Sequence, residues 1–260
     1  MRFPNALTRM RHPLYRVYER RLTASLPRHA LPKHVGVILD GNRRWARAAG
    51  RTIAGGHQQG ADHIAAFLGW AEEMDVQVVT IWLLSTDNLS RSEQELADLL
   101  PIITDAVQSL ADSRHWRLRI VGTLGLLPEG TREELLKAAE TTVDCTGMVV
   151  NIAVGYGGRD EIADAVRSLL RARAAEGKTL TEVAETLSTS DIADHLYTTG
   201  QPDPELLIRT SGEQRLGGFL LWQSAHSEFY FCEAYWPDFR RVDFLRALRS
   251  YTQRERRLGR

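Results

Sequence analysis

Asp40 lies between an apolar segment, residues 35–39, and a glycine, an asparagine and two arginines at residues 41–44. The apolar segment predicts a buried strand, and the basic residues after it predict the start of a helix. A helix N-terminus directs backbone N–H groups and the positive end of the helix dipole at one point, which favours phosphate binding. A carboxylate there would repel the phosphate unless a divalent cation joined the two. The segment therefore predicts a magnesium-diphosphate site, with Mg²⁺ as the cofactor.

A second candidate anion site lies in residues 209–215, where Arg209 and Arg215 flank a polar turn. A guanidinium group can bind two phosphate oxygens at once, and each charge-assisted hydrogen bond is worth about 1.5–3 kcal/mol. A surface turn with solvated arginines would have the same sequence, so the residues alone leave both interpretations open. Two separate anion sites would fit a reaction between two diphosphates.

Apolar, β-branched runs alternate with segments of helical periodicity along the chain, which predicts an α/β fold. Such alternation is typical of a mostly parallel sheet, here of about six strands, with helices on both faces. Ligands of these sheets collect at the carboxyl ends of the strands, where Asp40, residues 85–88, residues 155–159 and Arg209 fall. Strands are predicted at 35–39, 76–84, 117–122, 148–154, 205–210 and 228–232, and helices at 57–73, 92–113, 131–142, 159–175 and 241–256.

The composition limits the classes of function. The 260 residues are 43% hydrophobic, enough for a sizeable core, and the formal net charge of zero argues against a generic nucleic-acid-binding protein. Cys145 and Cys232 are far apart and lack the spacing of a metal site, which fits a reducing cytoplasm. No apolar run approaches the roughly 18 residues of a membrane span. The N-terminus lacks the apolar core of a secretory signal.

Five segments, taken in order, resemble the motifs of the cis-prenyltransferases, a family that includes undecaprenyl diphosphate synthase and its short-chain relatives. The first is Asp-Gly-Asn-Arg-Arg-Trp-Ala at 40–46, and together the segments extend over about residues 34–259. Five ordered motifs are more specific than any one of them. The resemblance implies an enzyme that extends an allylic diphosphate with isopentenyl diphosphate and forms a Z double bond. The other four segments are 84–88, 151–159, 207–215 with 219–223, and 228–231 with 236–237.

The resemblance also implies where the two substrates and the metal bind. Asp40 would hold Mg²⁺ on the allylic diphosphate, and Glu228 from the other subunit of a homodimer would help to place the metal. Arg209 and Arg215 would bind isopentenyl diphosphate, with Arg44 near both substrates. The residues expected around the allylic diphosphate are Gly41, Asn42, Arg43, Arg44 and His57, and the further matching positions are Trp45, Arg91, Leu216 and Gly217.

The second motif would supply the residues nearest the proton that leaves isopentenyl diphosphate. They are Asn88 and Ser85, and Thr86 and Asp87 of the same motif would also bind substrate. An amide has no useful basicity, so we interpret Asn88 as a positioning group and the departing diphosphate as the better base. The C-terminal residues 257–259, Arg-Leu-Gly, resemble a tail motif that closes over the second site.

Three positions depart from the family pattern. Arg43 stands where a glycine is common, and Gly217 stands where a hydroxyl residue is expected. Ile53 stands where long-chain members carry an arginine, which removes a phosphate contact. Arg43, Arg44 and Arg51 then remain as candidate cations for the allylic site, and the choice of allylic substrate is the property most affected.

Leu83 is expected to limit the length of the product, because long-chain members carry a small residue there. Forcing a growing chain past the larger side chain would cost on the order of 1–3 kcal/mol. The pattern most resembles the short-chain, Z-farnesyl diphosphate synthase branch, which implies geranyl diphosphate as the primer and a fifteen-carbon product. Leu83 as ordinary strand core is the alternative interpretation. A longer-chain synthase, a branching or cyclising lavandulyl-type synthase and a silent partner subunit also stay open, although Asp40 argues against the last.

Residues 1–33 hold eight Arg or Lys residues and a single acidic residue, Glu19. Apolar residues at 14, 17, 18 and 22 have helical spacing, which predicts an amphipathic helix. The helix could dock on the core or contact an anionic membrane surface at the inner face of the plasma membrane. We expect a basic helical segment at 1–33 and a cis-prenyltransferase catalytic domain at 34–260.

Overall fold

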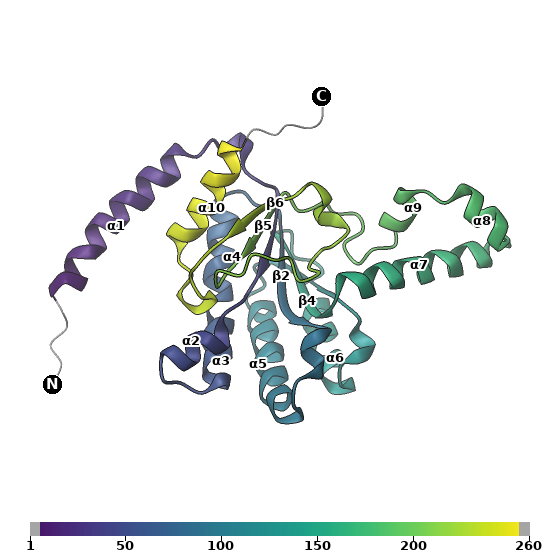
Figure 1. Ribbon diagram of the computed structural model, residues 1–260, viewed down its shortest axis with the longest axis horizontal. Coiled ribbons are helices and arrows are strands. Elements are labelled where there is room, and N and C mark those ends of the chain that lie inside the picture. Colours follow the sequence, from purple (N-terminus) through teal and green to yellow (C-terminus); the bar gives the residue numbers. More distant parts are fainter. Residues whose placement is uncertain (1–5, 255–260) are drawn as a thin grey trace.

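Six strands form one sheet in which every neighbouring pair is parallel, in the order β3-β4-β2-β1-β5-β6 (Figure 1). The computed structural model describes residues 6–254, with side chains from residue 15 onward. The predicted α/β fold with a parallel sheet of about six strands is confirmed, and each strand lies within two residues of its predicted position. The strands are β1 His34–Ile38, β2 Val78–Ser85, β3 Arg117–Val121, β4 Val149–Tyr156, β5 Leu206–Arg209 and β6 Glu228–Phe231.

The helices also follow the predicted pattern, with one clear difference. The helix predicted at 57–73 is two helices, because its hydrogen bonding is interrupted at His63, whose ring packs edge-on against Trp70 and Trp236. The α-helices are α1 Ala6–Ser25, α2 Asn42–Ala48, α3 Ile53–Asp62, α4 Ile64–Glu73, α5 Glu93–Asp112, α6 Glu129–Glu140, α7 Gly158–Ala175, α8 Leu180–Thr186, α9 Thr189–Ala193 and α10 Arg241–Gln253.

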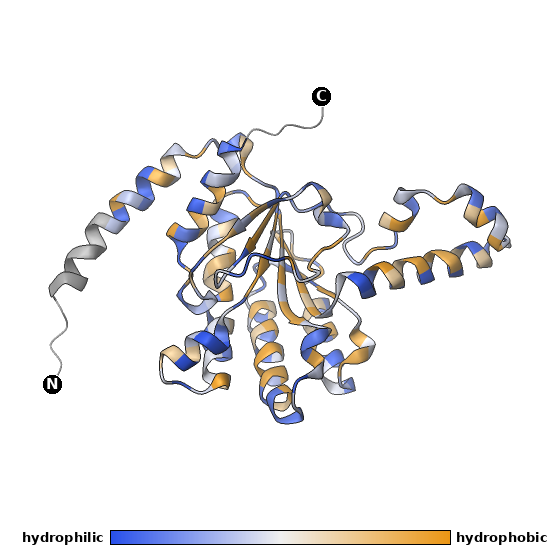
Figure 2. Cartoon of the chain, viewed as in Figure 1, coloured by the Kyte–Doolittle hydropathy of each residue, from blue (hydrophilic) through white to orange (hydrophobic). Residues whose placement is uncertain are grey.

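Alternate residues of the strands enter two separate hydrophobic clusters, one on each face of the sheet. Val37 and Ile208 belong to the larger cluster, whereas Ile38 and Leu207, their neighbours in the chain, belong to the smaller one. Residues from α4, α5, α6 and α10 complete the larger cluster, and Phe219 and Leu220 complete the smaller. Figure 2 shows the resulting concentration of hydrophobic residues in the central strands.

The carboxyl end of β1 lies at the centre of the end of the sheet where the site forms. β1 lies between β2 and β5, so the chain leaves these three neighbouring strands at one edge of the sheet. Asp40 follows β1, Ser85 ends β2 and Arg209 ends β5. A crevice at such an edge is the usual ligand site of a parallel α/β sheet.

A bulge in β2 sets the direction of two leucines near this edge. The β2–β4 register shifts between Trp82 and Leu84, so Leu83 has no partner on β4. Trp82 packs on the smaller cluster, whereas both Leu83 and Leu84 pack on the larger one. Regular alternation would have sent Leu84 to the other face, and bulges that redirect side chains in this way are common beside active sites.

Two parts of the chain extend from opposite sides of the body, namely α1 and the arm formed by α7, α8 and α9 (Figure 1). The end of α1 is anchored by Leu22 and Leu26, which are buried. The rings of Tyr15 and Tyr18 lie under the guanidinium groups of Arg240, which directly precedes α10, and of Arg246 within α10. Within residues 6–254, no helix is both long and apolar enough to cross a membrane.

Candidate active site

A polar pocket of about 590 Å³ opens at the carboxyl ends of β1, β2 and β5. It brings together residues from three of the five motif segments and from α3, and the residues that line it are up to 179 positions apart in the sequence. The predicted site residues that line it are Asp40, Gly41, Asn42, Arg43, Arg44, His57, Leu83, Ser85, Asp87, Asn88, Arg91, Arg209, Arg215 and Gly217.

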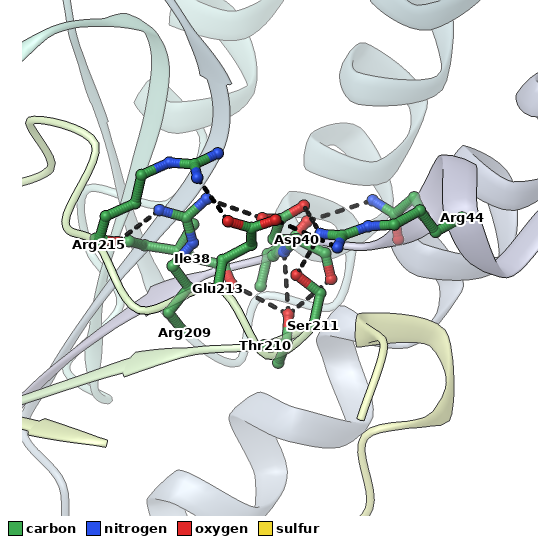
Figure 3. Close-up of polar contacts among 10 residues, drawn as sticks. Ile38, Asp40, Arg44, Arg209, Thr210, Ser211, Glu213 and Arg215 are labelled. Atoms are coloured by element: carbon green, nitrogen blue, oxygen red, sulfur yellow. Dashed lines mark hydrogen bonds and ion pairs between the residues drawn. The ribbon is translucent and has the colours of Figure 1, made fainter. Parts of the chain in front are cut away.

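Asp40 lies between two arginines at the base of this pocket (Figure 3). Arg209 Nη2 donates to Asp40 Oδ2 at 2.8 Å, and Arg44 Nη2 lies 3.4 Å from Asp40 Oδ1. Burial opposes ionisation of Asp40, but the hydrogen bond and charge of Arg209, together with the charge of Arg44, outweigh it and lower the pKa of the carboxyl. The carboxylate is therefore ionised and fixed in position at neutral pH.

The backbone around Asp40 is held by the neighbouring strand and has little room. The amide of Asp40 donates to Thr210 Oγ1 at 2.9 Å, and this hydroxyl donates to the carbonyl of Asp40 at 2.7 Å. Gly41 has a φ of 106°, and a Cβ there would lie 2.7 Å from the ring of Tyr235. Only glycine fits this left-handed turn, which directs the start of α2 into the pocket.

Glu213 organises the arginines on the β5 side of the pocket (Figure 3). Its carboxylate pairs with Arg44 at 3.3 Å and with Arg215 at 2.5 Å. Arg44 also donates to Ser211 Oγ at 2.6 Å, and Arg209 donates to the backbone carbonyl of Arg215. The guanidinium groups of this side are thus positioned around a common space by contacts within the chain.

Glu95 positions arginines on the α2 side of the pocket, as Glu213 does on the β5 side. It pairs with Arg91 at 3.0 Å and with Arg43 at 3.5 Å, so two arginines from different elements share one carboxylate. His57 lies beside them, and its Nε2 atom is buried without a hydrogen-bond partner. Burial, and then the charge of Arg91, lower the pKa of His57 to about 4. His57 is therefore neutral at pH 7 and can direct an N–H group into the pocket.

The second motif folds as a short turn after β2. The backbone amide of Asn88 donates to Ser85 Oγ at 3.1 Å, which places both residues at the pocket wall. Trp82, which also lines the pocket, stacks on Phe219 with ring centroids 5.1 Å apart. The turn therefore presents an amide and a hydroxyl beside a rigid aromatic wall.

Several predicted residues do not line the pocket. Arg51, a candidate cation for the allylic site, instead lies over the ring of Trp45, 5.5 Å from Cζ to the ring centroid. Neither residue is part of the pocket wall, so Arg51 is not among the arginines that face the pocket. Thr86 lies against Gly157, and Leu216 packs on the smaller hydrophobic cluster. Residues 257–259 lie outside the described part of the chain.

Glu228 is at the other end of its strand. It pairs with Leu206 in the sheet, three residues before Arg209, and it forms an ion pair with Arg254. One copy of the chain therefore does not bring Glu228 to Asp40. Its contribution from a second subunit stays a prediction.

Three charged residues of the site were missed by the sequence analysis: Arg47, Glu95 and Glu213. Glu95 could have been found, because it follows Arg91 by four residues at the start of a predicted helix. Glu213 lies within the motif that contains Arg209 and Arg215, but the motif does not show that it bridges two arginines. Arg47 lines the pocket from the last turn of α2.

An apolar cavity of about 40 Å³ adjoins the polar pocket. Leu39, Asn42, His57 and Leu83 line both spaces, so they form the boundary between them. The remaining wall comes from α3, α4 and α5 and consists of Gly60, Ala61, Ile64, Leu99, Ile102, Ile103 and Ala106. An apolar chain that passed from the polar pocket into the cavity would therefore contact this boundary, of which Leu83 is part.

The oxygen donors of the pocket are compatible with Mg²⁺ held jointly with a ligand. In the described part of the chain, no three His, Cys, Asp or Glu side chains are close enough to hold a metal by themselves. Mg²⁺ commonly binds through one or two carboxylates, substrate phosphates and water. Asp40, ionised and surrounded by phosphate-binding arginines, fits that kind of site.

Known proteins match the chain over nearly its whole length. The family model described as "Putative undecaprenyl diphosphate synthase" matches residues 38–259. A (2Z,6E)-farnesyl diphosphate synthase from Thermobifida fusca is 60% identical over 251 residues, which cover 96% of this chain and 98% of that protein. A (2Z,6E)-farnesyl diphosphate synthase from Mycobacterium tuberculosis is 52% identical, with 97% and 98% covered.

A solved structure agrees with this match. Lavandulyl diphosphate synthase from Lavandula x intermedia, in complex with dimethylallyl diphosphate, superimposes with a TM-score of 0.80 at 34% identity. The comparison covers 88% of this chain and 98% of that one. From the pocket, the sheet and these relatives together, we conclude that the chain belongs to the cis-prenyltransferase family.

Proposed function

We propose that the chain is a magnesium-dependent cis-prenyltransferase that joins isopentenyl diphosphate to a short allylic diphosphate. Geranyl diphosphate is the favoured primer and Z,E-farnesyl diphosphate the product. The bond between C1 and the diphosphate oxygen of the primer breaks, and pyrophosphate leaves. C1 then bonds to C4 of isopentenyl diphosphate, and the loss of a proton from C2 forms the new Z double bond.

The observation that carries this proposal is a single pocket with two groups of arginines that opens onto an apolar cavity at Leu83. Two groups of guanidinium side chains suit two diphosphates, and the apolar cavity suits a hydrocarbon chain. The identity of 60% to a (2Z,6E)-farnesyl diphosphate synthase supports the same activity.

The residues of the pocket divide between the two substrates. The N-terminus of α2, with Arg43, His57 and Arg91, binds the allylic diphosphate, which becomes the leaving group. Arg209 and Arg215 bind the diphosphate of isopentenyl diphosphate. The fixed arginines stabilise charge as it develops on the leaving oxygen, which is the type of contribution that lowers a reaction barrier most.

Ser85 and Asn88 orient isopentenyl diphosphate at the pocket wall. The neutral amide of Asn88 does not take the proton itself, because its basicity is too low. The departing diphosphate, held close by Arg43 and Arg91, is the proton acceptor that the geometry offers. Leu83 ends chain growth after one addition.

Asp40 would hold Mg²⁺, and Glu228 of a partner subunit in a homodimer would complete the metal site. When bound, the metal neutralises charge on the allylic diphosphate and makes it a better leaving group. Within this chain, the contribution of Asp40 is a fixed, ionised carboxylate, which Arg209 and Thr210 hold in place.

We further propose a cytoplasmic protein with peripheral contact to anionic lipid through residues 1–33, followed by the catalytic domain at 34–260. The exposed side chains of Arg16, Val17, Arg20 and Arg21 on α1 support this proposal, since a basic and partly apolar helix surface suits a membrane interface. Sedimentation with vesicles that contain anionic lipid, compared with neutral vesicles, tests it.

Mass spectrometry of the dephosphorylated product tests the main proposal. Purified protein is given isopentenyl diphosphate with geranyl or dimethylallyl diphosphate. A fifteen-carbon Z,E alcohol from geranyl diphosphate is expected. Products of fifty carbons or more would identify a long-chain synthase, and a branched or cyclised ten-carbon product from dimethylallyl diphosphate would identify a lavandulyl-type enzyme. The absence of any prenyl product would refute the proposal.

A further inference from the structure

Arg47 lies in the last turn of α2 and lines the polar pocket together with Arg43 and Arg44. Successive residues of an α-helix are rotated by about 100°, so Arg47 projects about 40° from Arg43 and about 60° from Arg44. It therefore lies between these two side chains on the helix surface, about one turn farther from Asp40. The three arginines form one face of α2 toward the pocket.

Arg47 differs from every other arginine in the pocket wall because, within the described residues, its charge is not paired with a carboxylate. Arg43 and Arg91 pair with Glu95, Arg44 and Arg209 pair with Asp40, and Arg215 pairs with Glu213. Arg47 has no ion-pair or hydrogen-bond partner for its side chain within the described residues. It is exposed, so its guanidinium group is free to take a ligand without losing an internal partner.

Stabilisation of the helix end by Arg47 does not explain why its side chain lines the pocket. A basic residue in the last turn stabilises the helix dipole whichever way it points. Arg51, four residues farther on, is also exposed but lies over the ring of Trp45 and does not line the pocket. Of these two neighbouring exposed arginines, only Arg47 faces the substrate space.

We infer that Arg47 is a further binding residue for the allylic diphosphate, which it contacts at the outer, terminal phosphate. The inference rests on the proposed function, since it takes the primer to bind at the N-terminus of α2. The inner phosphate lies against the helix N-terminus and Arg43, and the outer phosphate extends along α2 toward Arg47. Arg209 and Arg215 come from the opposite side of the pocket, so the second substrate does not depend on Arg47.

Three variants test this role: Arg47→Ala, Arg47→Lys and the matched control Arg51→Ala. Steady-state kinetics give the KM of each substrate, and calorimetry gives the Kd of inorganic pyrophosphate with magnesium. Loss of one exposed charge-assisted contact should raise the KM of geranyl diphosphate and the Kd of pyrophosphate by about tenfold in Arg47→Ala. We expect partial recovery in Arg47→Lys and values close to the wild type in Arg51→Ala.

Two results would overturn the inference. One is an equal effect of Arg47→Ala and Arg51→Ala, which would indicate general electrostatic attraction. The other is an increase confined to the KM of isopentenyl diphosphate, which would assign Arg47 to the other substrate.

The pyrophosphate measurement separates this inference from the proposed function. If the wild type forms no prenyl product but Arg47→Ala still weakens pyrophosphate binding selectively, the function is wrong and the binding role stands. If the wild type forms the fifteen-carbon product and Arg47→Ala binds pyrophosphate and geranyl diphosphate normally, the binding role is wrong and the function stands. Both side chains are exposed, so equal melting temperatures of the variants would confirm that folding is unaffected.

Discussion

The two cavities that meet at Leu83 are built on different principles. The polar pocket takes its residues from strand ends and holds arginines in place with carboxylates, such as Arg209 with Asp40 at 2.8 Å. The apolar cavity takes its walls mainly from α3 and α5 and contains almost no group that could react. In our proposal, the polar pocket determines which bond is formed, and the apolar cavity determines how many times an isoprene unit is added. Four residues line both spaces, so a substitution at a residue that lines one of them alone should leave the property of the other unchanged.

The largest expected effect is a loss of turnover in Asp40→Ala, with no change in the length of the residual product. Removal of a group that stabilises charge in the transition state should lower kcat by about 10²–10³-fold or more. Steady-state rates across a magnesium titration give the size of the loss. Asp40→Asn keeps the shape of the side chain and removes its charge, so it shows how much of the loss is due to the charge. Activity near that of the wild type at saturating magnesium would show that Asp40 is not the metal anchor.

Arg209→Ala and Arg215→Ala should act mainly on one substrate within the polar pocket, and Arg209→Ala should also lower kcat, because Arg209 holds Asp40 in place. Each removes charge-assisted contacts worth about 1.5–3 kcal/mol, so the KM of isopentenyl diphosphate should rise about 10–100-fold. Arg132→Ala in α6 is the control, because Arg132 does not line the pocket and its one ion pair among the described residues is with the exposed Glu129. If the increase fell on the allylic substrate instead, the two substrates would have to exchange places in the pocket.

Leu83→Ala should lengthen the product and leave the reaction itself intact. The smaller side chain joins the two cavities, and radiolabelled products should include chains of twenty carbons and longer. Leu84→Ala is the matched control. Leu84 is fully buried, so the substitution should cost about 2–5 kcal/mol of unfolding free energy and keep the fifteen-carbon product.

A different outcome would support the alternative interpretation, in which Leu83 is ordinary strand core. If Leu83→Ala lowered the melting temperature as much as Leu84→Ala and left the product at fifteen carbons, Leu83 would not be the stop. The wall contributed by α5, with Leu99 and Ile103, would then be the next place to test.

The last expected effect is one of pH and concerns His57, which belongs to both cavities, and His34, which belongs to neither. Burial lowers the pKa of each to about 4, from an ordinary value of 6.5. The unfolded chain therefore binds more protons between these values. The free energy of unfolding should fall as the pH falls through this window, by about 1.4 kcal/mol per pH unit for each histidine.

Ligand binding should change the pKa of His57 but not that of His34. A diphosphate beside His57 favours its protonated form, so the pKa of His57 should rise when pyrophosphate binds, whereas that of His34 should stay near 4. NMR titration of the ring protons measures both in one sample. Equal behaviour of the two rings would place His57 outside the diphosphate site.

Most of the fold could be predicted from the sequence because its signals are local. Each strand is a short apolar or β-branched run, and the polar residues that follow β1, β2 and β5 had to meet once the strands were parallel. The division of one predicted helix at His63 could not be predicted, since it accompanies ring contacts with Trp236, far away in the chain.

The candidate site shows the same limit. Arg51 and Arg47 are equivalent in sequence terms, yet one lies over Trp45 and the other lines the pocket. Arg47 is in the last turn of α2 and Arg51 follows that helix, so the direction of each side chain depends on where α2 ends and on what packs nearby. Likewise, the bulge at Leu83 depends on the register between β2 and β4, which no single strand reveals.

The carboxylates of the pocket also have a consequence for product release. Asp40, Glu95 and Glu213 each pair with at least one arginine, so an incoming diphosphate must compete with them. The same competition operates in reverse after the reaction, when each guanidinium group can exchange a pyrophosphate oxygen for a nearby carboxylate. We expect this exchange to limit how tightly pyrophosphate is retained and thereby to let the next cycle begin, a step that often sets the turnover number of an enzyme.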